Sequence, residues 1–234
     1  MRQSAFKSTG VFMNRFYSCS AGLAPAAIIN SYFRYKTLNQ PDSWLDFPLY
    51  FIHIPKTAGT SICSALQMRD PGHLLFKEMR RATARKFSQK RCFMVVRDPL
   101  ERLVSTYNYA TDAWIEGRRH LVGFIGSFNS GEEFLSRFIS TPKLHQLYFL
   151  RPAFQFYQDA LDHGAHVDIL RFEDIERVFP AYMNSIGFPP AELTREKVSR
   201  SKKFKKEHVP PEISNRIYDI FSDDEALRRH AWTP

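Results

Sequence analysis

The stretch that decides the fold reads Leu49-Tyr-Phe-Ile-His-Ile-Pro-Lys-Thr-Ala-Gly-Thr-Ser61. Its apolar start, rich in β-branched and aromatic residues, predicts a strand over Leu49–Ile54 that is buried on both faces. A short loop with one lysine and several hydroxyl groups follows, and then a segment suited to a helix over 61–68. A strand, a tight loop and a helix N-terminus bring backbone N–H groups and the positive end of the helix dipole to one point. The stretch therefore predicts an anion site, to which Lys56 adds charge and Gly59 a close backbone approach.

The order of the loop residues argues against a nucleotide triphosphatase. The Walker loop, G-x-x-x-x-G-K-[ST], places its lysine after the second glycine. Here Lys56 precedes Gly59, and no glycine lies upstream in the strand. A simpler alternative stays open, which is an ordinary strand-to-helix turn whose helix is capped by Thr60 or Ser61.

A second stretch, Arg97-Asp-Pro-Leu-Glu-Arg-Leu-Val-Ser-Thr-Tyr107, follows another apolar run, Cys92–Val96, which predicts a second buried strand. Asp98 and the proline after it suit the start of a helix. Arg97 would stand where a parallel strand ends, and ligand groups commonly lie there in open α/β sheets. An arginine fork at that place and the hydroxyl of Ser105 can reach one phosphate. The alternative is that Arg97 only pairs with Asp98 or Glu101, and that Ser105 is a neutral helix residue.

Together the two stretches resemble the donor-binding elements of sulfotransferases that use 3′-phosphoadenosine 5′-phosphosulfate (PAPS). Lys-Thr-Ala-Gly-Thr-Ser resembles their 5′-phosphosulfate loop, and Arg-Asp-Pro-x-x-Arg-x-x-Ser-x-Tyr resembles their 3′-phosphate motif. Both occur in family order, each at a predicted strand-to-helix junction. The likeness is closest to the carbohydrate branch, with its heparan and chondroitin 2-O-type enzymes and bacterial relatives. It is firm over about 49–109 and looser beyond.

The resemblance implies a fold and an activity. The fold would be α/β, a three-layer P-loop-like architecture with a mostly parallel central sheet flanked by helices, which the predicted alternation of strands and helices also favours. The activity would be transfer of a sulfonate from PAPS to an acceptor hydroxyl, on a glycan or other carbohydrate, without a metal and with adenosine 3′,5′-bisphosphate (PAP) as product. Carried over by position, the 5′-phosphosulfate would be held by Lys56, Thr57, Gly59, Thr60 and Ser61, and the 3′-phosphate by Arg97 and Ser105. Arg102 and Tyr107 match the motif as supporting or packing residues.

Catalysis would need charge stabilisation and a general base. Lys56 would stabilise charge on the leaving phosphate. His73, in Gly72-His-Leu-Leu-Phe76, resembles the catalytic histidine segment of heparan 2-O-sulfotransferases and is the first candidate base. His73 could instead be a histidine of a turn, in which case His145 and Glu78 are the reserve candidates for the base. We interpret His53 as a core or supporting histidine.

The charge pattern favours anionic partners. The 234 residues carry a formal net charge of +9. Two runs concentrate this charge: Lys77, Arg80, Arg81, Arg85, Lys86, Lys90 and Arg91, and then Arg200, Lys202, Lys203, Lys205 and Lys206. Two other functions therefore stay open: a non-catalytic polyanion-binding protein on the same fold, and a small-molecule kinase with a degenerate phosphate loop. No nucleic acid partner is expected.

The remaining features concern organisation and location. We expect one sulfotransferase domain over 42–234, preceded by an N-terminal arm, 1–41, that is either flexible or a targeting segment. No run reaches the length of a membrane-spanning helix. Three cysteines give neither a disulfide framework nor a metal spacing. We expect a soluble protein of the cytoplasm, with the Golgi lumen as the alternative. The acceptor region departs from relatives, with Ala153 at a usual glutamine, so acceptor identity does not carry over.

Overall fold

The protein is an α/β structure built on a parallel sheet. The computed structural model describes residues 49–78, 91–115, 125–189, 191–193 and 204–234. Within them, β1 (Leu49–Ile52), β2 (Arg91–Val96) and β3 (Val167–Arg171) form a three-stranded sheet in the order β1-β2-β3, with both pairings parallel. The α/β class and the parallel sheet that the sequence predicts are confirmed. The first strand ends earlier than predicted, because its pairing with β2 stops at Ile52.

Helices account for most of the remaining described chain. Seven of them are well bounded: α3 (Gly59–Ala65), α5 (Pro99–Ile115), α7 (Gly131–Ser140), α8 (Ala153–Asp162), α9 (Ile175–Ser185), α10 (Pro211–Ile220) and α11 (Ser222–Arg229). Three short 3-10 helices are also described: η1 (Pro142–Gln146), η2 (Phe172–Asp174) and η3 (Lys206–His208). The helix after the first strand begins at Gly59 rather than at the predicted Ser61. The predicted basic helices over 74–90 and the arm 1–41 lie largely or wholly outside the described residues.

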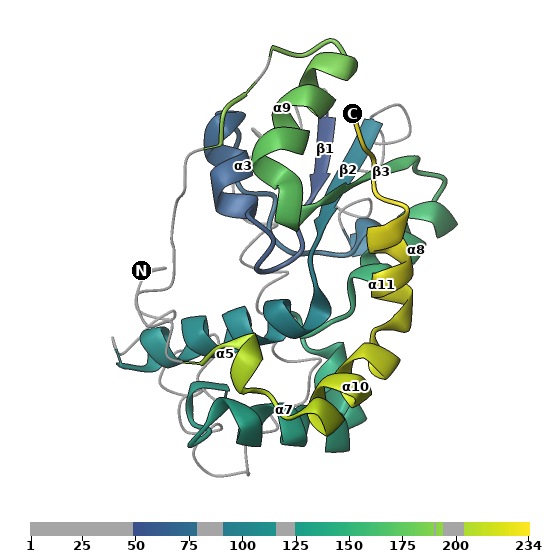
Figure 1. The fold of residues 1–234 in the computed structure, drawn as a ribbon. Coiled ribbons are helices and arrows are strands. Elements are labelled where there is room, and N and C mark those ends of the chain that lie inside the picture. The colour runs from purple at the N-terminus through teal and green to yellow at the C-terminus, as the bar shows by residue number, and fades with distance from the viewer. Residues whose placement is uncertain (1–48, 79–90, 116–124, 190, 194–203) are drawn as a thin grey trace, which may run out of the picture.

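Helices cover both faces of the sheet, as Figure 1 shows. Since side chains alternate along a strand, Phe51 and Phe93 point to one face, where they pack with α3 and α9. Ile52 and Met94 point to the other face, toward α8 and Leu227 of α11. All four side chains are at most 1% exposed. This explains why β1 and the core of β2 are apolar at every position.

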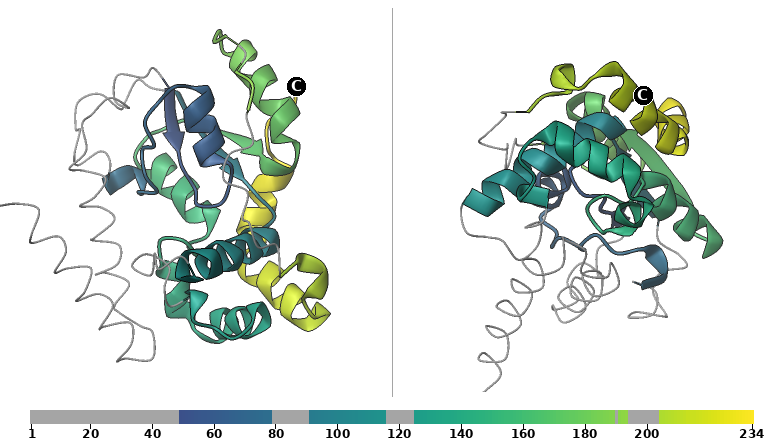
Figure 2. Two further views of the ribbon diagram at one scale, coloured as in Figure 1. Left: turned by 90° about the vertical axis from the view of Figure 1, so that its left-hand side faces the viewer. Right: turned by 90° about the horizontal axis from the view of Figure 1, so that it is seen from below.

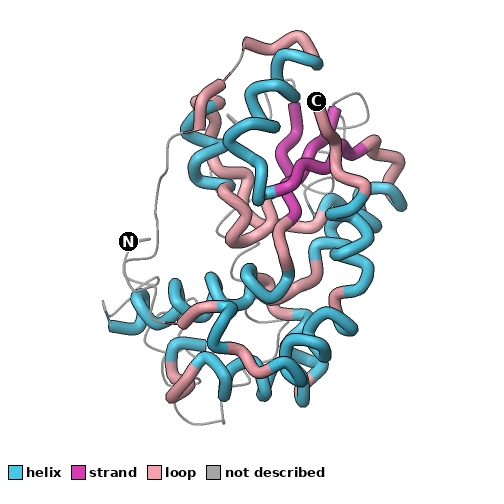
Figure 3. The backbone as a smooth tube through the Cα atoms, in the orientation of Figure 1, coloured by secondary structure: helices cyan, strands magenta, loops and turns pink. Residues whose placement is uncertain are grey.

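A second, purely helical part lies beyond the carboxyl end of β2, which leads directly into α5. The helices α5, α7 and α10 gather there around their own apolar core, with Leu103, Phe134, Phe138 and Ile217 fully buried. Figures 1 and 2 show these helices side by side below the sheet, and Figure 3 shows that the described chain of this part is helix and loop. The segment after β1 and the start of α5 therefore lie where the sheet meets the helical part.

Local signals at the ends of elements mostly act as predicted. Asp98 caps α5, with its Oδ1 accepting a hydrogen bond from the Glu101 amide at 2.8 Å. Cys63 and Cys92 are buried thiols, while Cys19 lies outside the described residues. Within the described part of the chain, no helix is both long and apolar enough to cross a bilayer.

Candidate active site

Residues 55–59, the loop that the sequence predicts to bind the donor and that is here called the donor loop, have an unusual backbone. Lys56 and Ala58 both adopt left-handed conformations, with φ of 68° and 63°. Such angles cost a non-glycine residue roughly 1–2 kcal/mol. Ala58 is the N-cap residue of α3 and makes no side-chain cap, so the predicted alternative in which Thr60 or Ser61 caps the helix is not observed. The loop is therefore held in a strained shape by its surroundings.

Gly59 is required by a close contact rather than by its backbone angles. A Cβ built on Gly59 would lie 1.8 Å from Nε2 of His53, far inside contact distance. The sequence predicts that Gly59 lets the backbone approach a ligand, but the approach seen here is to the ring of a histidine from the same chain. The glycine therefore lets His53 pack directly beneath the start of α3.

The hydroxyl residues of the loop are not equivalent. Thr57 is fully buried, and its hydroxyl donates to the carbonyl of Ile54 at 2.8 Å, which closes the turn. Ser61 is also buried, whereas Lys56 and Thr60 are half-exposed. A ligand at the donor loop would thus meet the side chains of Lys56 and Thr60, while Thr57 could offer only its amide.

A histidine cluster lies next to the donor loop. His53 is buried, and its Nδ1 lies 2.7 Å from Oδ1 of Asp70. Nδ1 of His73 lies 2.9 Å from the backbone carbonyl of His53, and the two rings are 4.0 Å apart. A carbonyl can only accept, so His73 carries its proton on Nδ1 and presents the lone pair of Nε2. This is the tautomer that a base acting through Nε2 requires.

The charge states of the cluster follow from burial and neighbours. Burial, together with the nearby His53 and Lys56, lowers the pKa of His73 to about 3, so its ring is neutral at pH 7. Partial burial acts to raise the pKa of Asp70, but the hydrogen bond from His53 and the amide of Gly72 hold it well below its usual range. Asp70 is therefore a carboxylate that accepts from His53.

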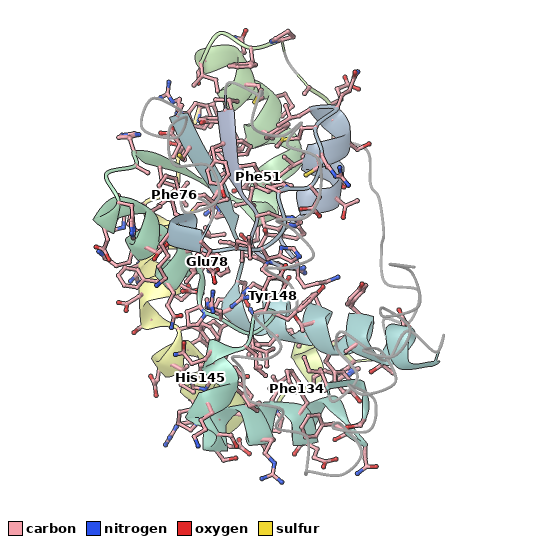
Figure 4. All side chains as sticks on the ribbon, turned by 180° about the vertical axis from the view of Figure 1, so that it is seen from behind. Phe51, Phe76, Glu78, Phe134, His145 and Tyr148 are labelled. Carbon is pink, nitrogen blue, oxygen red and sulfur yellow. The ribbon has the colours of Figure 1, made fainter. Side chains whose placement is uncertain are left out.

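The two reserve bases are placed less well. His145 stacks on Phe138, and its Nε2 donates to the carbonyl of that residue at 3.1 Å. Figure 4 shows His145 near the level of Phe134 in the helical part, away from Phe51 of the sheet, with Tyr148 between the two levels. Glu78 accepts from the amide of Leu75 at 2.9 Å. Of the three candidate bases, His73 is the one that belongs to the histidine cluster beside the donor loop.

The second predicted motif meets the first through Arg97. Its Nη1 donates to the carbonyl of Lys56 at 3.3 Å, and its Nη2 donates to Glu101 at 3.1 Å. The guanidinium also lies over the ring of Phe172, 4.2 Å from its centroid. Arg97 Nε is buried and has no hydrogen-bond partner in the structure as described. The predicted alternative, an ion pair of Arg97 with Glu101, is thus present, but the same side chain also joins the two motifs.

One face of α5 turns toward the donor loop. Glu101, Ser105 and Tyr109 follow one another at four-residue steps, so they share this face. At one end of the row, Glu101 holds Arg97; at the other, Nζ of Lys56 lies 4.4 Å from the centroid of the Tyr109 ring. Ser105, half-exposed, lies on the helix one turn from Glu101 and one turn from Tyr109, the two residues that these cations contact. The structure thus brings Lys56, Arg97 and Ser105 into one neighbourhood.

The other face of α5 belongs to the core. Arg102 is 1% exposed, donates to the carbonyl of Arg151 at 2.9 Å and lies 3.9 Å from Asp224. Tyr107 is buried and stacks on Phe134. Both geometries agree with the packing role that the sequence indicates for these two motif residues.

The end of the second basic run is tied to the start of α5. Nζ of Lys206 and the hydroxyl of Tyr218 both lie 2.8 Å from Oδ2 of Asp98. Asn108 exchanges hydrogen bonds with the backbone of Phe204, at 2.8 and 3.3 Å. The positions 200–203 of that run lie outside the described residues.

Sequence reasoning missed the roles of Asp70, Tyr109 and Asn108, because only the fold brings them to their partners.

Comparisons with known proteins add no family. No protein-family model matches this chain, and neither a curated protein nor a solved structure does. Among the residues that the structure describes, no group of three or more His, Cys, Asp or Glu side chains is arranged to hold a metal ion.

Proposed function

We propose that this chain is a PAPS-dependent sulfotransferase that transfers a sulfonate to an acceptor hydroxyl, on a fold of the P-loop-like kind. The observation that carries the proposal is the contact between the two motifs, in which Arg97 donates to the carbonyl of Lys56. This contact places Arg97, a cation suited to the 3′-phosphate, beside the donor loop, which is suited to the 5′-phosphosulfate. PAPS bears two separate phosphate positions, whereas the phosphates of ATP form one chain.

The residues at the proposed 3′-phosphate position fit a phosphate if the phosphate replaces Glu101 as the partner of Arg97. An arginine fork binds phosphate oxygens in pairs, and Arg97 has a buried Nε without a partner in the described structure. Its Nη2 is held by Glu101, whose side chain is 41% exposed. A 3′-phosphate would replace this carboxylate on the guanidinium and accept from the hydroxyl of Ser105. Glu101 would then turn into solvent.

The transfer would be an in-line displacement at sulfur. The acceptor oxygen forms a bond to sulfur while the bond from sulfur to the bridging oxygen of the 5′-phosphate breaks, and its electron pair stays on PAP. Lys56 would stabilise the charge that grows on that oxygen. The proton of the acceptor hydroxyl would pass to Nε2 of His73, whose Nδ1–H remains on the His53 carbonyl.

The same arrangement would make His73 a better base once the donor is bound. Lys56 is one of the groups that lower the pKa of His73. A phosphosulfate paired with Lys56 would offset this positive charge and add negative charge nearby. Burial remains the main cause of the low pKa of His73, but the donor would raise this pKa through its charge. The base would thus be strongest when its reaction partner is in place.

For the acceptor we propose a carbohydrate. What supports this class is the net charge of +9, which favours an acidic ligand, together with the resemblance to the carbohydrate branch. A screen of sugar, glycan and phenol acceptors with sulfur-labelled PAPS tests the class. Label transfer to phenols alone would replace the carbohydrate with an aromatic acceptor.

The donor test uses isothermal titration calorimetry. We expect PAP and PAPS to bind wild type, and Lys56→Ala to weaken binding about 10- to 100-fold through loss of a charge-assisted contact. Lys143→Ala removes an exposed lysine of η1 and serves as the matched control, with unchanged affinity expected. Absence of PAP and PAPS binding by wild type would refute the proposal. Magnesium-dependent ATP turnover would support the kinase instead, and salt-dependent heparin binding without turnover would support the polyanion binder.

A further inference from the structure

We infer that Asp70 and His53 form a positioning pair that holds the donor loop and the base His73 in one fixed arrangement. The inference rests on the proposed function and extends it to two residues that touch neither the donor nor the acceptor. It is carried by three contacts that meet at His53. One runs to Asp70, one to Gly59 and one to His73.

The first contact fixes the orientation of the His53 ring. Asp70 is an ionised carboxylate, so His53 donates to it from Nδ1, at 2.7 Å. Asp70 itself is held by the amide of Gly72, which donates to the same oxygen at 2.8 Å. A ring pinned at Nδ1 directs its opposite edge, which carries Nε2, toward the donor loop.

The second contact makes that edge a support for the donor loop. The ring lies so close to Gly59 that a Cβ there would be 1.8 Å from Nε2 and 2.1 Å from Cδ2. His53 is 5% exposed and stacks on Phe51, which limits the space into which the ring could withdraw. Because Gly59 directly follows the strained residue Ala58, the ring supports the part of the loop with the costliest backbone.

The third contact passes through the main chain of the same residue. The His53 carbonyl accepts from Nδ1 of His73 at 2.9 Å, and the hydroxyl of Tyr148 accepts from the His73 amide at 2.9 Å. The side chain of His53 thus sets the donor loop, while its backbone sets the tautomer of the base. A shift of His53 would move the donor and the base relative to each other, and transfer rates are sensitive to such shifts.

A double-mutant cycle tests the contact between His53 and Gly59. We expect Gly59→Ala to weaken PAP binding at least tenfold in the wild-type background, because the new methyl group displaces the ring. In the His53→Ala background there is space for it, so adding Gly59→Ala should change affinity by less than about threefold. Equal losses in the two backgrounds would overturn the inference.

A second variant guards against misfolding of His53→Ala. The Asp70 side chain is 50% exposed, so Asp70→Ala should fold, as checked by circular dichroism and thermal unfolding. We expect it to lower both PAP affinity and kcat about tenfold, and to remove the Nδ1–H signature of His53 from ¹⁵N NMR spectra. His145, which must carry its proton on Nε2 to donate to Phe138, is the internal reference of opposite tautomer.

The outcomes separate this inference from the proposal beneath it. If wild type binds PAP but Asp70→Ala keeps full affinity, kcat and the His53 signature, the positioning pair is refuted and the sulfotransferase proposal stands. If wild type does not bind PAP or PAPS, the proposed function fails and the inference falls with it. His230→Gln, which removes an exposed histidine at the end of α11, should leave affinity, kcat and both cluster tautomers unchanged.

Discussion

The donor loop and the first half of α5 carry the two parts of the proposed donor site, and they are built in opposite ways. In the donor loop the backbone is unusual, with Lys56 and Ala58 in left-handed conformations and Gly59 against a ring. In α5 the backbone is a regular helix with an ordinary aspartate cap. What is unusual there is the distribution of side chains over two faces.

This difference tells us how each part can fail. Apart from loss of the Lys56 charge, substitutions in the donor loop act through shape, because its strained backbone is held by buried neighbours. Substitutions in α5 act through charge, and their effect depends on the face. Arg97 and Glu101 face the donor loop, whereas Arg102, in the same motif, is part of the core.

The largest effect is expected at His73, the proposed base beside the donor loop. His73→Gln should lower turnover about 10²- to 10⁴-fold, the usual contribution of a general base, and leave PAP affinity within about twofold. Turnover is measured with labelled PAPS, and PAP affinity by calorimetry. His145→Gln is the matched control and should keep its turnover. A His73→Gln variant with wild-type turnover would remove His73 as the base.

The pH dependence gives a second test of the same residue. Only neutral His73 can accept a proton, and its pKa of about 3 keeps it neutral in the free protein well below pH 7. Activity that depends on this group is therefore lost as the pH falls through the pKa, so kcat/KM should show no acid limb from His73 between about pH 5 and pH 8. The acid limb of kcat should lie at higher pH than that of kcat/KM, because the bound donor offsets the charge of Lys56. An acid limb at one and the same pH in both profiles would contradict this coupling.

The two arginines of the second motif should differ in what they control. Arg102→Ala leaves Asp224 buried beside an empty space, so we expect a loss of about 3–5 kcal/mol in the free energy of unfolding. Urea unfolding measures this loss.

Arg97→Ala is the contrasting control for Arg102→Ala. It should cost less than about 1 kcal/mol of stability, since its partner Glu101 is partly exposed, yet weaken PAP binding about 10- to 100-fold. If the two variants behaved alike in both assays, the division of the second motif into a ligand-binding arginine and a core arginine would be wrong.

The part of the fold that the sequence predicts is the part governed by local rules. Apolar runs around Phe51 and Phe93 identify strands buried on both faces, and Asp98 before a proline identifies the start of α5. These signals depend on neighbours in the chain. The left-handed angles at Lys56 and Ala58 carry no such signal, because neither residue is glycine or asparagine.

The residues of the candidate site could be predicted from the sequence, but the residues that each of them contacts could not. Lys56, Arg97 and His73 can be singled out from the sequence, and the structure brings them near one another. That Gly59 makes room for His53, that Asp70 holds this ring and that Tyr109 lies under Lys56 all depend on contacts between distant segments. The order of residues along one chain does not specify which distant segments will come into contact, so these pairings could not be predicted.

A smaller effect is expected from the carboxylate that competes for Arg97. Glu101→Gln removes the negative charge without shortening the side chain, and it frees the guanidinium for a phosphate. PAP affinity should rise about two- to fivefold, the scale of a partly exposed ion pair. Glu133→Gln, an acid in the first turn of α7, is the control and should leave PAP affinity unchanged. Weaker binding by Glu101→Gln would mean that Glu101 holds Arg97 in place for the donor rather than competing with it.

The smallest effect should come from relieving the strain of the donor loop. Ala58 has a φ of 63°, which costs alanine roughly 1–2 kcal/mol but glycine almost nothing. Part of this gain is lost because glycine makes the unfolded chain more flexible, so Ala58→Gly should stabilise the protein by about 0.5–1 kcal/mol. The same substitution at Ala226, within α11, should destabilise it by about the same amount, since glycine is unfavourable inside a helix. Urea unfolding should show opposite changes in the free energy of unfolding for the two variants if the strain is real.

PAP binding to Ala58→Gly should weaken slightly, by about twofold, because a less restricted loop has more freedom to lose when it closes on the phosphate. Stabilisation without any loss of affinity would mean that the strained backbone of the loop does not contribute to donor binding.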